Sequence, residues 1–297
     1  ILAQACAACV LLQSLVSLRI LPAMVASLGF FTGYALAWSA YFVASFELLL
    51  RYFSKSVYFS SKPSEAAYLS VIVLPVVALT VEGFMHFRWN SYTTWQERIN
   101  TPEDSAIRLC IIQCVWQTCC CAWHILGRYT FSAQMLGHHL AVLTLCAIVA
   151  VAPFCHWSIS FFAGVIEFTN LPLSVMDLFK AFKELQKMHP TIYTLAQVTF
   201  CISFLVLRIG FWLPMFWMVL SDSKVFLESS RSFGIQQVAA CYMVPSLGFL
   251  TGLQLFWGWK ISCAVLKMLG IKETRSDDSD CKDLASKDPA SYGSGKP

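Results

Sequence analysis

The sequence predicts an all-α protein, a polytopic transmembrane helix bundle with about seven spans. Hydrophobic residues make up 57% of the chain and charged residues 13%, and the mean hydropathy is +0.62. Soluble domains carry about 25% charged residues, so lipid is the solvent that this composition fits. The apolar residues are also grouped in long stretches, and a helix needs roughly 20 of them to cross about 30 Å of hydrocarbon.

Seven stretches meet this length requirement. In chain order they are residues 23–50, 66–87, 105–127, 134–153, 156–179, 192–220 and 235–266. Residues 1–18 are apolar but short, and Arg19 and Pro22 end them, so an eighth span or a fragment of one is left open. Because lipid offers the backbone no hydrogen bonds, each stretch is expected to be a helix.

Polar segments separate the predicted spans, and several of them contain proline near the next helix start. The C-terminal segment is rich in Ser, Asp and Lys and has no hydrophobic periodicity, which is typical of disorder. We therefore expect three parts. They are an N-terminal transmembrane segment over 1–59, a main membrane domain over 60–268 and a disordered cytosolic tail over 269–297.

The distribution of Lys and Arg predicts the orientation. The loops that follow the first, third and fifth predicted spans, together with the C-terminal flank, carry Arg51, Lys55, Lys62, Arg128, Lys180, Lys183, Lys187, Lys260, Lys267, Lys272 and Arg275. The opposite loops carry fewer: Arg19, Arg88, Arg98, Arg108, Lys224 and Arg231. Basic residues concentrate in short cytosolic loops, so the first set and the C-terminus are expected to be cytosolic.

Composition also argues against several function classes. The net charge is only +4 and the basic residues are scattered, whereas nucleic-acid binding needs a concentrated basic face. Most of the 13 cysteines lie within or beside apolar runs, where a free thiol behaves as a small hydrophobe. They lack the spacing of a zinc site. We therefore expect no metal and no cofactor.

Few ionisable or amide groups fall within the spans, and such groups are costly in lipid and tend to mark a functional interior. They are Glu47, Glu82, His86, His124, His138, His139, Glu167, Asn170, Asp177 and Arg208. At about 1.5 Å per residue, the paired histidines lie roughly one turn inside the predicted cytosolic end. By the same rise, Glu167 and Arg208 lie at similar depths of about 20 and 24 Å, which predicts that they form an ion pair.

His138 and His139 are followed about 28 residues later by "EFTNLPL" (167–173), and then by "FLVLRIGFWLP" (204–214). The order of these three motifs resembles the TLC-domain family of membrane proteins, over roughly residues 60–265. The resemblance implies six core helices around a lipid-accessible cavity. The family includes the ceramide synthases, in which paired histidines are required to transfer an acyl chain from coenzyme A to a sphingoid-base amine.

On this resemblance, His138 and His139 are the candidate catalytic residues. The candidate lipid-binding residues are His124, Glu167, Asn170 and Arg208. The acidic motif of the ceramide synthases is not reproduced in this chain, which favours the TLC-domain-containing subgroup of the family. The expected function is therefore lipid homeostasis, by binding a membrane lipid or acyl chain within the bundle. The alternative is an acyl-CoA-dependent N-acyltransferase of ceramide-synthase type, so whether the protein is an enzyme is left open.

Simpler interpretations compete with these. The histidines and Asn170 could serve helix–helix hydrogen bonds, and Asp177, close to Lys180 and Lys183, is typical of a solvated helix end. A metal site at His124 and the paired histidines has no supporting spacing. A transporter is a third possibility, but it would need broken helices or an internal repeat. The expected partners are membrane lipids and, for the alternative, long-chain acyl-CoA. The endoplasmic reticulum is the expected location and the plasma membrane the alternative, while the oligomeric state is open.

Overall fold

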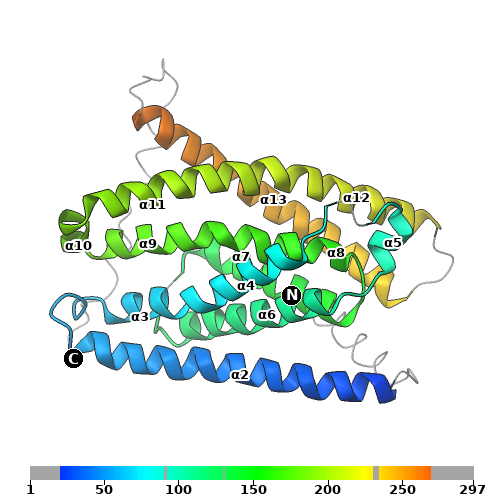
Figure 1. Cartoon of the computed structure of the whole chain (residues 1–297), viewed down its shortest axis with the longest axis horizontal. Coiled ribbons are helices and arrows are strands. Elements are labelled where there is room, and N and C mark those ends of the chain that lie inside the picture. The colour runs from blue at the N-terminus through cyan, green and yellow to red at the C-terminus, as the bar shows by residue number, and fades with distance from the viewer. Residues whose placement is uncertain (1–20, 90–91, 130, 230–233, 269–297) are drawn as a thin grey trace. The chain divides into compact units, whose positions relative to one another are not determined.

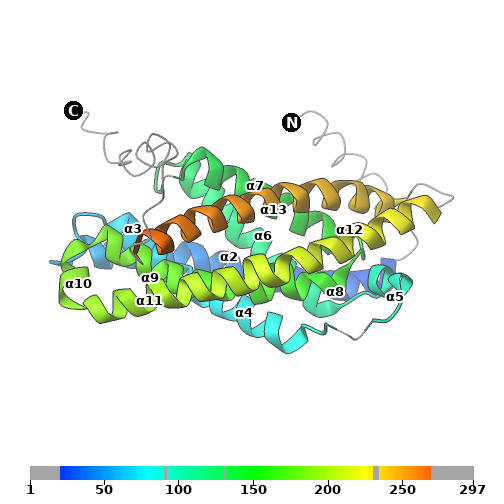
Figure 2. The ribbon, with the colours of Figure 1, turned by 90° about the horizontal axis from the view of Figure 1, so that it is seen from above.

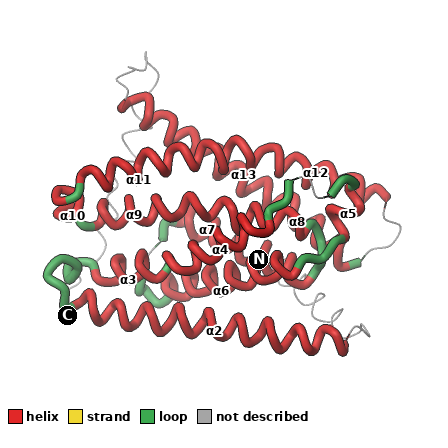
Figure 3. Tube along the Cα trace, viewed as in Figure 1, coloured by secondary structure: helices red, strands yellow, loops and turns green. Residues whose placement is uncertain are grey.

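The computed structural model describes residues 21–89, 92–129, 131–229 and 234–268. Within these ranges the chain forms helices joined by turns and loops, without a strand (Figure 3). The elements are α2 (Leu21–Ser54), α3 (Pro63–Val71), α4 (Val73–His86), α5 (Trp95–Asn100), α6 (Asp104–Ile125), α7 (Ala133–Val151), α8 (His156–Ile159), η1 (Ser160–Gly164), η2 (Val165–Thr169), α9 (Asn170–Ala181), α10 (Lys183–Met188), α11 (Pro190–Ser203), η3 (Phe204–Phe211), α12 (Trp212–Ser229) and α13 (Ile235–Met268). The all-α prediction is confirmed. The predicted eighth span and the predicted tail lie outside the described residues.

Seven helical segments of the described chain are long and apolar enough to cross a membrane. They are Phe31–Ser54, Pro63–His86, Asp104–Ile125, Ala133–Val151, His156–Ala181, Pro190–Ser229 and Ile235–Leu266. Each overlaps one predicted stretch, which confirms the polytopic bundle. The agreement follows from a simple cause, because the length of an apolar run sets where a helix enters and leaves lipid.

The chain divides into two compact units, Ile1–Leu255 and Phe256–Pro297. Within the first unit the fifth span is the most enclosed, with 67% of its most apolar window buried. It is made of α8, η1, η2 and α9, and it packs against α4, α6 and η3. Figures 1 and 2 show α9 alongside α11. In the second unit, the described residues belong to α13, where the Lys260 ammonium lies 4.3 Å from the centre of the Phe256 ring.

Two glycines allow the second and fifth spans to approach closely. A Cβ atom added to Gly83 on α4 would lie 2.5 Å from the backbone carbon of Gly164 on η1. A Cβ on Gly164 would in turn lie 2.5 Å from the Cα of Gly83. Small residues serve this purpose in membranes, where close backbone packing replaces the hydrophobic effect as the force that holds helices together.

The loops alternate between two ends of the first unit, as the order of spans requires. At one end, which we call the basic end, the loop after α2 meets the turn after α9, with the Phe59 and Phe182 rings 4.8 Å apart. Tyr129, from the loop after α6, stacks on Tyr68 there at 4.2 Å. At the opposite end, the backbone N–H of Cys155 donates to the Ile99 carbonyl (3.1 Å). Three loops that the charge distribution assigns to one side of the membrane therefore lie at the same end of the unit. That this side faces the cytosol stays a prediction.

Candidate functional site

The paired histidines lie in the first turns of α7, near the basic end. The helix begins after Ser132, whose hydroxyl accepts a hydrogen bond from the Met135 N–H (3.2 Å) and so caps the first turn. His139 is only 4% exposed, and its ring lies 4.5 Å from that of Phe131. His138 is half-buried, with its ring 5.7 Å from that of His139. Neighbours on a helix point about 100° apart, so the two imidazoles face different surroundings.

His139 opens a chain of buried hydrogen bonds that runs into the bundle. Its Nδ1 is bonded to the Oε1 of Gln117 on α6. The Gln117 Nε2 donates to the Gln113 Oε1 (2.8 Å), one turn away on the same helix. The Gln113 Nε2 donates to the Glu167 Oε1 (2.8 Å) on η2. Three spans are thus joined by polar side chains that are each at least nine-tenths buried.

Beyond Glu167 the series of hydrogen bonds continues to the sixth span. The Asn170 Nδ2 donates to the second oxygen of Glu167, and the Asn170 Oδ1 accepts from the Arg208 Nη2 (3.2 Å). The Arg208 Nε also donates to the Thr169 hydroxyl (2.6 Å). We call this set the polar network. It consists of His139, Gln117, Gln113, Glu167, Asn170, Thr169 and Arg208.

The predicted ion pair between Glu167 and Arg208 takes an indirect form. Both side chains are buried, and the hydrogen bonds of the Arg208 guanidinium go to Thr169, Ile166 and Asn170 rather than to the Glu167 carboxylate. Asn170 lies between them and bonds to both. This bridge replaces the predicted direct ion pair, because a side-chain amide offers a donor to the carboxylate and an acceptor to the guanidinium at once.

Irregular backbone accompanies the network. The fifth span changes from α-helix to a π-helical segment (η1) and then a 3-10 segment (η2), and the sixth span contains the π-helical segment η3. Such segments disturb the regular backbone bonds, and the network occupies carbonyls there. The Ile166 carbonyl accepts from Thr169 (2.8 Å) and from Arg208 (3.4 Å), and the Ala163 carbonyl accepts from Gln113 (3.4 Å). Irregular backbone at membrane depth is tolerated where protein groups satisfy it in this way, and π-helical segments are frequent at functional sites.

The network crosses between spans and also extends along the bundle. His139 lies about 9 Å from the start of its span, at 1.5 Å per residue. Gln117 and Gln113 lie about 12 and 18 Å from the same end of α6. Glu167 is about 21 Å from the end of its own span. The network therefore leads from near the basic end to the middle of the membrane.

Two further polar residues of the predicted spans, one of them a predicted site residue, have other roles. His124 lies outside the network, and its Nδ1 accepts the backbone N–H of Phe131 (3.0 Å). It thereby holds the loop whose Phe131 ring covers His139. Asp177 forms an exposed ion pair with Lys180 (3.0 Å), the solvated helix end that the sequence predicts.

Sequence reasoning missed Gln113 and Gln117, the two residues that connect the histidine to the carboxylate. A signal was present, because two amides four residues apart lie on one face of a helix and can bond to each other. A buried primary amide needs hydrogen-bond partners, as an ionisable group does, so glutamines inside a span are candidates for such a network as well.

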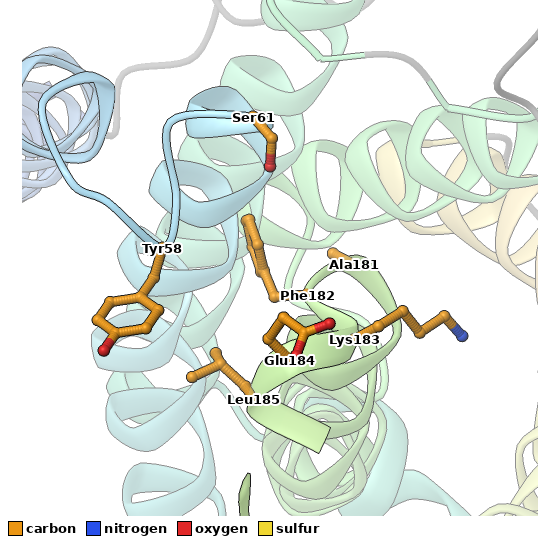
Figure 4. A pocket seen from close by; sticks show the side chains of 7 residues that line it. All are labelled: Tyr58, Ser61, Ala181, Phe182, Lys183, Glu184 and Leu185. Carbon is orange, nitrogen blue, oxygen red and sulfur yellow. The ribbon is translucent and has the colours of Figure 1, made fainter. Parts of the chain in front are cut away.

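A small pocket lies elsewhere, at the basic end. Its volume is about 140 Å³, and it is lined by Tyr58, Ser61 and residues 181–185 (Figure 4). None of the six predicted site residues lines it. The lipid-accessible cavity expected behind the histidines therefore stays a prediction. Among the residues that the structure describes, no three His, Cys, Asp or Glu side chains are grouped closely enough to hold a metal ion.

Comparison with known proteins identifies a family. A family model, that of the TLC domain, matches residues 22–263. The matched range includes all six predicted site residues and both glutamines of the network. A search of curated proteins and a search of solved structures found no match.

Proposed function

The chain belongs to the TLC-domain family of integral membrane proteins, and from this we propose that it binds a membrane lipid or acyl chain within its helix bundle and serves lipid homeostasis. The polar network is the proposed binding site, with His139 at its outer end. The partners in this proposal are membrane lipids.

One observation carries the proposal. The Nε2 atom of His139 is buried and has no hydrogen-bond partner, although Nδ1 of the same ring is bonded to Gln117. A buried polar atom without a partner costs about 1–3 kcal/mol. The Nε2 atom lies at the end of a network whose other groups are hydrogen-bonded. A ligand whose polar group bonds to Nε2 removes this cost.

The proposed location is the endoplasmic reticulum membrane, where lipid synthesis concentrates, and the plasma membrane is the alternative. Immunofluorescence of the tagged full-length protein against markers of both membranes separates the two.

A second candidate function is N-acyl transfer, and the same imidazole favours it. In that reaction a sphingoid-base amine attacks the thioester carbonyl of a long-chain acyl-CoA. The amine proton passes to the His139 Nε2, and the coenzyme A thiolate then leaves and takes up this proton. An imidazole whose Nδ1 is hydrogen-bonded to the protein and whose Nε2 has no partner suits this step, because the Nε2 lone pair can accept the amine proton. His138 points about 100° away around the helix, so this step is assigned to His139 alone.

Lipid analysis of the purified protein tests both candidates. The wild-type protein and the His139→Phe variant are purified in mild detergent, and the extracted lipids are identified by mass spectrometry. Thr144→Val is the matched control, because it removes a hydroxyl from α7 that bonds to Tyr242 outside the network. We expect one lipid class to remain with the wild type and the control and to be depleted in His139→Phe. Equal lipid content in all three proteins would contradict the proposal.

The two candidates differ in what accompanies the protein. Acyl-CoA among the extracted molecules, an acyl adduct on a histidine, or formation of N-acyl product from added acyl-CoA and sphingoid base would favour the transferase. A bound lipid without any of these favours binding alone.

A further inference from the structure

The polar network fixes the proton position on His139, and we propose that this selects lipids which donate a hydrogen bond through a hydroxyl or ammonium group. Gln113 and Gln117 are then positioning residues for His139. The inference rests on the proposed function, since it names the ligand class of the same site.

The first step is the orientation of Gln113. Its side-chain nitrogen faces the Glu167 carboxylate (2.8 Å) and also the backbone carbonyl of Ala163 (3.4 Å). A backbone carbonyl only accepts hydrogen bonds, so the group facing it is the amide NH₂. The orientation of Gln113 therefore holds whether or not Glu167 carries a proton, and its oxygen faces Gln117.

The second step follows from the first. Because the Gln113 oxygen only accepts, Gln117 presents its own NH₂ to it (2.8 Å). The Gln117 oxygen is then turned to His139, where it also only accepts. The His139 Nδ1 is consequently the donor and carries the proton.

The third step concerns the other ring nitrogen. A neutral imidazole has one N–H, so protonation of Nδ1 leaves Nε2 with a bare lone pair. That atom is buried without a partner in a residue that is 4% exposed. A hydroxyl or an ammonium group satisfies it, whereas an ester or ketone group brings only acceptors and leaves it unsatisfied. A site that pairs with a donor strongly rejects a ligand lacking that donor.

The proton position is directly observable. In the wild-type protein labelled with ¹⁵N-histidine, the His139 signals are assigned as those lost in His139→Phe. We expect Nδ1 to show a bonded proton and Nε2 to show none. In Gln117→Met, which keeps the volume and removes the amide, the preference is expected to be lost and the N–H to distribute over both nitrogens. A proton on Nε2 in the wild type would overturn the inference, and the spectrum of the wild-type protein is sufficient to show it.

Ligand selection is tested with three single-chain lipids that share an 18-carbon chain. Octadecanol and octadecylamine carry a donor, and methyl octadecanoate carries only acceptors. We expect the alcohol, the amine or both to bind the wild type about tenfold or more tightly than the ester, which corresponds to one hydrogen bond to a buried acceptor. Comparison of the two donors identifies which one the site prefers. His139→Phe is expected to bind all three alike, and Thr144→Val to keep the wild-type order.

The outcomes separate the two proposals. Equal affinity of the wild type for the ester and the two donors would contradict the selection of donor lipids, but it would still agree with the proposed lipid binding. If none of the three lipids binds the wild-type protein and no lipid co-purifies with it, the proposed function itself is overturned.

Discussion

Arg208 is a charged residue in an apolar helix, and its charge needs partners from other parts of the bundle. The residue is 6% exposed, and its partners are the Thr169 hydroxyl, the Asn170 oxygen and the Ile166 carbonyl. Each is a neutral acceptor, and the negative charge of Glu167 reaches it only across Asn170. A buried charge needs a compensating partner, so the amide that links the two residues matters as much as either charge.

We predict that Arg208→Ala lowers the free energy of unfolding by about 3 kcal/mol or more, because it leaves Glu167 uncompensated. Removing Glu167 as well is expected to recover part of the loss. A double-mutant cycle measured by reversible unfolding in detergent gives the coupling between the two residues. Repeating the cycle in an Asn170→Ala background is expected to reduce that coupling. Additive losses in the wild-type background would show that the two charges do not interact.

At the scale of elements, close approach of backbones holds the second and fifth spans together. The contact between α4 and η1 depends on the missing side chains of Gly83 and Gly164. By contrast, a Cβ added to Gly248 on α13 would meet nothing within 4 Å.

These glycines give a matched pair of substitutions. Gly83→Ala is expected to destabilise the protein by about 1–3 kcal/mol, since the added methyl group meets backbone that must shift. Gly248→Ala is expected to be neutral or to stabilise by up to about 1 kcal/mol, because alanine favours helix more than glycine does. Thermal unfolding of the two variants side by side measures both effects. Equal effects of the two substitutions would refute the role of the close approach.

The short helix α5 lies outside the membrane spans and shows how an exposed element is capped. The Thr94 hydroxyl accepts from the Glu97 N–H (3.3 Å), and the Glu97 carboxylate accepts from the Thr94 N–H (3.2 Å) and the Thr93 N–H (3.0 Å). This arrangement is a capping box. The hydrogen bond from the Thr94 backbone, followed by that from Thr93, lowers the pKa of Glu97 below its ordinary value.

The lowered pKa predicts a pH dependence for α5. A carboxyl group with a depressed folded-state pKa contributes its stabilisation above its ordinary pKa, and this contribution is lost as the pH falls through the folded-state value. Hydrogen-exchange protection of residues 95–100 is therefore expected to decrease at acidic pH in the wild type. Glu97→Gln should have lower protection already at neutral pH and a weaker response to acid. Unchanged protection in this variant would argue against the capping role.

At the scale of the whole molecule, the sequence predicts the spans well and the interior poorly. Seven apolar runs coincide with seven membrane-spanning segments of the described residues, because length and hydropathy are local properties of the chain. The π-helical and 3-10 segments beside Glu167 and Arg208 have no comparable signal. The role of Asn170 as a bridge, and the connection of His139 to Glu167 through Gln117 and Gln113, depend on which helix faces come together, and tertiary packing decides this.

Orientation is a further property of the whole molecule. The loops of the basic end lie together and carry the larger share of Lys and Arg, so we predict that this end and the C-terminus face the cytosol. An N-glycosylation acceptor inserted after residue 280 is expected to remain unmodified in cells. The loop between α4 and α5 is expected to face the lumen. An acceptor inserted there, with the loop lengthened to make it accessible, is therefore expected to be glycosylated. Modification of the C-terminal acceptor would reverse the assignment.

The binding of lipid at His139 has a direct structural test. Electron cryo-microscopy of the full chain in lipid nanodiscs, at a resolution that separates side chains, would place any ordered lipid relative to the polar network. We expect density for a lipid polar group within hydrogen-bond distance of the His139 Nε2, with its acyl chain among the spans. A map in which Nε2 is covered by protein side chains alone, with no lipid density inside the bundle, would contradict it.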